Sequence, residues 1–170
     1  MKYTTVVVDD RQHCLEVMRR MEEEFQRGDE AFFIKVMEDE PSLVLRVHAV
    51  TILADLGSEA AIPTLTNVLL HDPDPLVRHE AAFTMGQIGL TSGVRGLEEA
   101  TLGDKDPIVR HESAAALGSI GSQTAKATLQ AALKDVDELV RNSAAASLFN
   151  LEFLETFAIG GTARDRAPRP

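Results

Sequence analysis

Two dipeptides in the middle of the chain pair an imidazole with a carboxylate, His79-Glu80 and His111-Glu112. Neutral imidazole together with carboxylate is the ligand set typical of non-haem iron, manganese or zinc. The single cysteine, Cys14, excludes an internal disulfide and any Cys-x-x-Cys metal or redox motif. His79, Glu80, His111 and Glu112 are therefore the candidate metal ligands of this sequence.

The two dipeptides lie in a segment that the chain repeats. DPDPLVRHEAAFTMGQIG at residues 72–89 returns as DKDPIVRHESAAALGSIG at residues 104–121. An arginine recurs at one place in four such units, at intervals of 32, 32 and 31 residues: Arg46, Arg78, Arg110 and Arg141. A period of about 30 residues is typical of stacked helical hairpins, which bury their apolar faces against their neighbours.

Each unit predicts two antiparallel helices. An Asp-rich turn precedes the second helix, where an Asp can cap the first turn and Pro75 or Pro107 fits within it. We expect Gly57, Gly89 and Gly121 to end these helices in the left-handed conformation. The sequence thus predicts an all-α fold, an α-solenoid of about four helical-hairpin repeats with an N-terminal capping helix.

The predicted repeat domain spans residues 12–158. Its first part, residues 12–38, supplies the capping helix and the leading helix of the first repeat. Residues 1–11 form an N-terminal segment of uncertain structure, although TTVVV favours a strand. Residues 159–170 have no periodicity and include GGTARDRAPRP, so we expect a flexible C-terminal tail.

A helical projection of the second helix separates its core from its candidate site. Val77 and Met85 share one stripe, and His79 lies nearly opposite that stripe with Glu80 beside it. Adjacent helices pack about 8–10 Å apart, so equivalent histidines of neighbouring repeats can converge. The projection also places mostly small residues near the histidines, which predicts an open groove that a ligand could enter: Ala82, Phe83 and Gly86 near His79, and Ala114, Ala115 and Gly118 near His111.

A solvated His-Glu pair copied by repeat duplication is the alternative interpretation. The flanking repeats, however, carry RVHA and RNSA at the same place, so the pair is confined to the two central units, which favours a site. We interpret His48, in RVHA, as structural or solvated. The recurring Asp and Arg residues, such as Asp72 or Asp74 with Arg78, are interpreted as a structural ladder between repeats.

The composition narrows the function classes. A net charge of -10 and a pI near 4.9 argue against nucleic-acid binding. No run of about 18 apolar residues predicts a membrane span, and the first residues lack a secretory signal, so we expect a cytoplasmic protein.

The motifs PLVRHEAAFTMGQIG and PIVRHESAAALGSIG resemble the His-Glu motifs of deoxyhypusine hydroxylase, a HEAT-repeat di-iron monooxygenase. The resemblance covers about residues 40–150. That family is built from two similar halves, and this chain resembles one of them. The resemblance implies that His79, Glu80, His111 and Glu112 bind iron, that a homodimer replaces the two halves and holds two iron ions, and that dioxygen is the co-substrate. It also implies an amine-bearing small molecule or a lysine-derived protein as the substrate, which an acidic rim would attract.

The scaffold pattern DPDPxVR…ALGxIG also resembles, less specifically, the HEAT-like subunits of phycobilin lyases. Those subunits typically lack the paired His-Glu motif. The alternative function is therefore a metal-free HEAT-repeat scaffold for protein interactions, or a subunit similar to a phycobilin lyase.

Overall fold

The computed structural model describes residues 11–164, with the backbone alone for residues 157–164. The described chain is helical and contains no strand. In order along the chain the elements are α1 (Arg11–Arg27), α2 (Glu30–Asp39), α3 (Leu43–Leu56), α4 (Ile62–His71), α5 (Pro75–Ile88), η1 (Thr91–Gly93), α6 (Val94–Gly103), α7 (Pro107–Ile120), η2 (Gln123–Ala125), α8 (Lys126–Ala132) and α9 (Glu138–Arg164).

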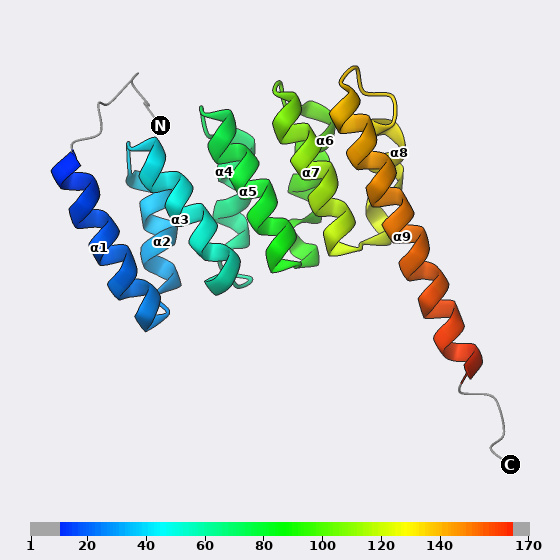
Figure 1. The fold of residues 1–170 in the computed structure, drawn as a ribbon, viewed down its shortest axis with the longest axis horizontal. Coiled ribbons are helices and arrows are strands. Elements are labelled where there is room, and N and C mark those ends of the chain that lie inside the picture. The colour runs from blue at the N-terminus through cyan, green and yellow to red at the C-terminus, as the bar shows by residue number, and fades with distance from the viewer. Residues whose placement is uncertain (1–10, 165–170) are drawn as a thin grey trace, which may run out of the picture.

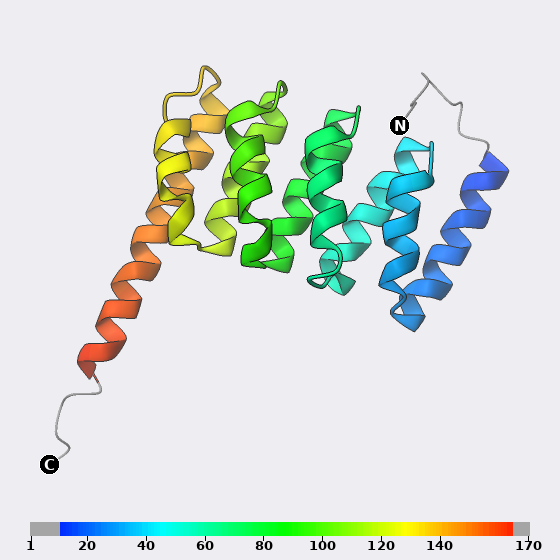
Figure 2. The ribbon, with the colours of Figure 1, turned by 180° about the vertical axis from the view of Figure 1, so that it is seen from behind.

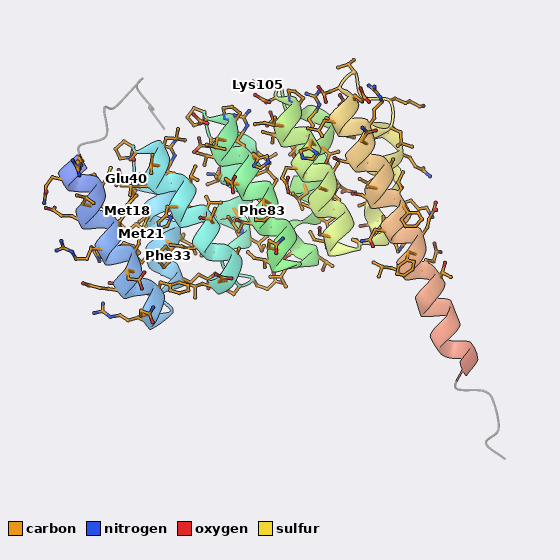
Figure 3. The ribbon with its side chains drawn as sticks, in the orientation of Figure 1. Met18, Met21, Phe33, Glu40, Phe83 and Lys105 are labelled. Atoms are coloured by element: carbon orange, nitrogen blue, oxygen red, sulfur yellow. The ribbon has the colours of Figure 1, made fainter. Side chains whose placement is uncertain are left out.

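The helices stack in two layers, as predicted for an α-solenoid. The helices α3, α5, α7 and α9 lie side by side in one layer, and α2, α4, α6 and α8 form the other (Figures 1 and 2). The predicted capping helix is α1, which packs against α2 and α3. Met21 of α1 and Phe33 of α2 are fully buried beneath this cap (Figure 3).

The starts of the central helices follow the prediction. The side chain of Asp74 accepts a hydrogen bond from Leu76 N (2.9 Å), and Asp106 caps α7 in the same way. The next residues, Pro75 and Pro107, open α5 and α7, where a missing N–H leaves no hydrogen bond unmade.

The helix ends follow the prediction at two glycines and depart from it at the third. Gly89 and Gly121 end α5 and α7 with φ of 74° and 73°, in the left-handed region. The prediction was wrong for Gly57, which is extended (φ -64°, ψ 135°). A Cβ on Gly57 would meet the backbone carbonyl of Leu53 in the last turn of α3 and the side chain of Ile88 on α5, and this crowding explains the glycine there.

A ladder of Arg–Asp pairs joins consecutive repeats. In each pair the arginine Nε donates to an aspartate of the next repeat, in the turn before that repeat's second helix. The pairs are Arg46 with Asp72 (3.0 Å), Arg78 with Asp104 (2.7 Å) and Arg110 with Asp135 (2.8 Å). The expected pairing of Arg78 with Asp72 or Asp74 was therefore wrong. Asp72 offers Arg78 only its backbone carbonyl, at 2.9 Å from Nη1.

The ladder changes at both ends of the solenoid. At the N-terminal end, His13 of α1 takes the place of the arginine and contacts Glu40 (Nε2 to Oε2, 3.1 Å). At the C-terminal end, Arg141 Nη1 donates to the carbonyls of Asp135 (2.8 Å) and Val136 (3.0 Å). Among the described residues no carboxylate forms an ion pair with Arg141.

The last helix is longer than expected. α9 continues to Arg164, past residue 158, where the repeat domain was predicted to end. Residues 1–10, with their predicted strand segment, and residues 165–170 of the predicted tail lie outside the described residues. No helix within residues 11–164 combines the length and apolar character needed to cross a membrane.

Candidate metal centre

The candidate ligands project from one layer of the solenoid because the ladder orients α5 and α7. Arg78 is buried, so its neighbours His79 and Glu80 point away from the core at the surface of that layer. The same step along α7 places His111 and Glu112 there. All four side chains are between 15% and 26% exposed.

Glu112 lies between the two histidines. Its Oε2 atom is 3.4 Å from Nε2 of His79 and 3.7 Å from Nε2 of His111. Nδ1 of His79 lies 3.2 Å from Oε1 of Glu80. The structure thus brings all four predicted residues into one cluster, in which a carboxylate of each repeat contacts His79.

The two carboxylates change the proton affinity of His79. The hydrogen bond to Glu112 raises the pKa of the His79 imidazole above its ordinary value, and the charge of Glu80 acts in the same direction, whereas burial opposes both. A proton on Nε2 occupies the lone pair that a metal would use. Metal and proton therefore compete for His79.

Ser143 is a contributor that the sequence analysis missed. Its Oγ donates to the carbonyl of Leu139 (3.0 Å) and is hydrogen-bonded to Nδ1 of His111. Because the hydroxyl proton is used on Leu139, the serine accepts from His111 Nδ1–H, which leaves the lone pair on Nε2 beside Glu112. In the repeat alignment, Ser143 of RNSA occupies the position of Glu112. This alignment could have predicted that Ser143 lies beside the histidines.

The donor chemistry of the cluster fits iron, although no three His, Cys, Asp or Glu side chains within residues 11–164 form a ready-made metal site. The two Nε2 atoms approach one oxygen of Glu112, which is the donor set of a non-haem iron centre. In this structure the carboxylates contact the imidazoles directly.

The predicted open groove of small residues was wrong. A Cβ atom on Gly86 would lie 2.9 Å from the Cβ of Ala116, and one on Gly118 would lie 2.6 Å from the Cβ of Ser147. These glycines therefore allow the next repeat to pack closely, and they leave no space for a ligand.

The exposed part of this layer is apolar around the cluster. Ala82 and Ala114 are buried, whereas Phe83 of α5 is 41% exposed (Figure 3). One exposed aliphatic side chain stands in the first turn of each helix of the layer: Val44, Leu76, Ile108 and Leu139. A row of this kind can exclude water from a ligand bound beside the histidines.

Two other histidines and the cysteine lie outside the cluster. His48 is exposed on α3, as interpreted, and His71 is exposed at the end of α4. Cys14 is half-buried, with its Sγ 3.9 Å from Ser42 Oγ. His48 and His71 form no ion pair with a described carboxylate.

Two solved structures share this architecture. Human deoxyhypusine hydroxylase, solved in complex with glycerol, is 31% identical with a TM-score of 0.67 over 74% of this chain and 44% of that chain. A chain of the CpcE–CpcF complex of phycocyanin lyase from Nostoc sp. PCC7120 is 26% identical with a TM-score of 0.59 over 72% of this chain and 52% of that chain. The chain therefore spans about half the length of each. No curated protein is a significant match to it.

The family assignment follows from the repeats themselves. The family model of HEAT repeats matches residues 30–102 and 65–149, which together include both His-Glu motifs and every ladder pair. These matches span most of the described solenoid. The chain belongs to the HEAT-repeat family.

Proposed function

We propose that this chain binds iron through His79, Glu80, His111 and Glu112 and acts as a dioxygen-dependent hydroxylase similar to deoxyhypusine hydroxylase. The observation that carries the proposal is the position of Glu112, whose Oε2 lies within 3.7 Å of both imidazole Nε2 atoms. The 31% identity to human deoxyhypusine hydroxylase supports the same assignment.

The side chains around the cluster have distinct roles in this proposal. The histidines bind through Nε2, and Glu112 provides a carboxylate between them. Ser143 holds the Nδ1 atom of His111 and so orients that ring. Glu80, whose Oε1 lies 3.2 Å from Nδ1 of His79, provides the second carboxylate. Bound iron would supply the activation of dioxygen, which these side chains cannot provide alone.

A second copy of the chain completes the ligand set in this proposal. Di-iron carboxylate centres use about six protein ligands, and one chain offers four. A two-fold dimer doubles that number and places two irons in one assembly. The dimer thus corresponds to the two halves of the longer enzyme that the sequence resembles.

The substrate class follows from the surface of the layer. Leu76, Ile108 and Phe83 are exposed and apolar around the cluster. An extended alkyl chain that ends in an amine complements this surface, because its methylenes contact the apolar side chains and the net charge of -10 on the protein attracts its cation. We therefore propose a lysine-derived or polyamine substrate.

The net reaction would insert one oxygen atom of dioxygen into a C–H bond of such an amine. The other oxygen atom would leave as water, with its electrons supplied by an external reductant and its protons by solvent. The part of the protein is to hold iron and substrate together and to exclude bulk water.

Iron content per chain is the decisive measurement. Protein loaded with ferrous iron without oxygen and then washed should retain about one iron per chain, as a dimer with one di-iron centre requires. His79→Ala/His111→Ala should lose it. His71→Ala, which removes an exposed histidine away from the cluster, is the matched control. Wild-type protein that retains no iron would overturn the proposal.

A metal-free scaffold is the second candidate. Both ring nitrogens of His79 already face carboxylates, so the cluster forms a satisfied charge network as it stands. The similarity to the phycocyanin lyase chain supports this function as well. A folded wild-type protein without iron would favour the scaffold, and hydroxylation of an amine substrate by the loaded protein would exclude it.

A further inference from the structure

The side of α9 that faces away from α7 and α8 is exposed and partly apolar. Val140, Ala144 and Leu151 are buried on one side of the helix. About 180° around the helix, Ala145 and Phe149 are exposed, and Phe149 is 71% accessible. Of the helices that the structure describes, α9 is the final one in its layer, and it extends past its neighbours (Figure 1).

The repeat register makes this face unusual. The counterparts of Ala145 in the three preceding repeats, Val50, Ala82 and Ala114, are all fully buried, because the next helix of the layer covers each of them. Only in α9, among the described repeats, does this position meet solvent. At this position α9 carries a small apolar residue, as the helices that contact a following repeat do, but no described helix packs against it.

A further repeat cannot occupy this face in the usual register. The counterparts of Phe149 are Ala54, Gly86 and Gly118, which are small because the next helix passes closely over them. A methyl group on Gly118 would already lie 2.6 Å from the Cβ of Ser147. A phenylalanine at this position therefore excludes the stacking used elsewhere and requires a partner helix with a different placement.

Two opposite charges lie along one edge of this face. Arg141 has the ladder position but no described carboxylate partner, and Glu152 is exposed further along the helix. Eleven residues separate them, which turns the helix by about 20° beyond three full turns, so both side chains lie on the same edge. The rise between them is about 16 Å.

We propose that α9 pairs with α9 of a second copy in antiparallel orientation, so that Arg141 of each copy meets Glu152 of the other. When two identical helices pair in antiparallel orientation, residues on one edge face the same edge of the partner helix. The two-fold axis therefore brings Arg141 of each copy beside Glu152 of the other, and their opposite charges attract. The axis passes between residues 146 and 147. Ala145 and Ala146 beside it allow a close approach, and each Phe149 packs over Ala145 of the other copy.

This pairing is a contact distinct from the homodimer of the proposed function, because α9 of each copy would stand between the two clusters of candidate ligands and keep them apart. It rests on α9 alone. The residues involved are separate from the four candidate ligands, and the contact does not require metal. Loss of metal binding and loss of pairing can therefore be observed independently.

The test is sedimentation equilibrium on metal-free protein over a concentration series. Wild type should form a dimer, and Glu152→Arg should weaken dimerisation by about tenfold or more, because a two-fold contact contains two repulsive pairs. Arg141→Glu should act similarly, and the double variant Arg141→Glu/Glu152→Arg should recover the affinity. Glu99→Arg, at an exposed glutamate of α6 in the other layer, is the control and should keep wild-type affinity.

Two further variants separate this contact from others. Phe149→Ala should weaken the dimer without loss of helical content, whereas His79→Ala/His111→Ala should leave it intact. A monomeric wild type would overturn the proposal. A dimer that tolerates both Glu152→Arg and Phe149→Ala would also overturn it, and would assign dimerisation to another face.

Discussion

Nε2 of His79 lies 3.4 Å from Oε2 of Glu112, so an imidazole of one repeat contacts a carboxylate of the next. The contact has the same direction as the ladder, in which Arg78 reaches Asp104 of the next repeat. Two contacts thus join these consecutive repeats. The Arg78–Asp104 ion pair is buried, and the His79–Glu112 contact is half-buried and nearer the surface.

The His79 contact predicts a pH-dependent stability in the metal-free protein. Because its pKa is raised when folded, His79 contributes stability that is fully present below the ordinary histidine pKa and is lost as pH rises through the folded value. Glu112→Gln should lower the pKa of His79, as measured by an NMR titration. Urea unfolding should show a smaller stability loss above neutral pH in this variant than in wild type. Equal pKa values in the two proteins would contradict the assigned contact.

Ser143→Ala should disturb His111 without disturbing the fold. The variant removes the acceptor of His111 Nδ1–H, so ¹⁵N NMR of the metal-free protein should show a mixture of imidazole tautomers. If iron binds as proposed, its affinity should fall by about 10-fold or more. Ser119→Ala, an exposed serine of α7, should leave both readouts unchanged. An unchanged tautomer in Ser143→Ala would show that Ser143 does not position the ring.

Arg78→Met should be much more damaging than Arg141→Met. The Arg78 side chain is 4% exposed and its partner Asp104 is 8% exposed, so the variant leaves a buried carboxylate unpaired, at a cost of about 3–5 kcal/mol. Arg141 contacts only carbonyls among the described residues, and its loss should cost about 1 kcal/mol. Urea denaturation of the two variants measures the difference. Similar losses would show that the ladder pairs contribute little.

Gly118→Ala should destabilise the solenoid by about 1–3 kcal/mol, because the added methyl overlaps Ser147 on the adjacent helix. Gly103→Ala is the matched control, since its methyl would meet nothing within 4 Å at the end of α6. That change should be neutral or stabilise by up to about 1 kcal/mol. Thermal unfolding of both variants gives the comparison, and a neutral Gly118→Ala would contradict the close packing of α7 on α9.

The sequence by itself determined the repeat, the helices and most of their boundaries. Caps, prolines and left-handed glycines act within a few residues, so Asp74, Pro75 and Gly89 could be interpreted from their neighbours. The period then required a solenoid, because one helical hairpin cannot bury its apolar face alone. The four candidate ligands could likewise be placed on one surface from the helical projection.

Only the tertiary structure decided which residues of neighbouring repeats meet. The carboxylate partner of Arg78 is Asp104, the space beside Gly118 is filled by Ser147, and His111 is held by Ser143. A projection gives the direction of a side chain around its own helix, but it does not give the height at which the next helix crosses. That height is set by side-chain packing between layers, so these contacts could not be predicted from the local sequence.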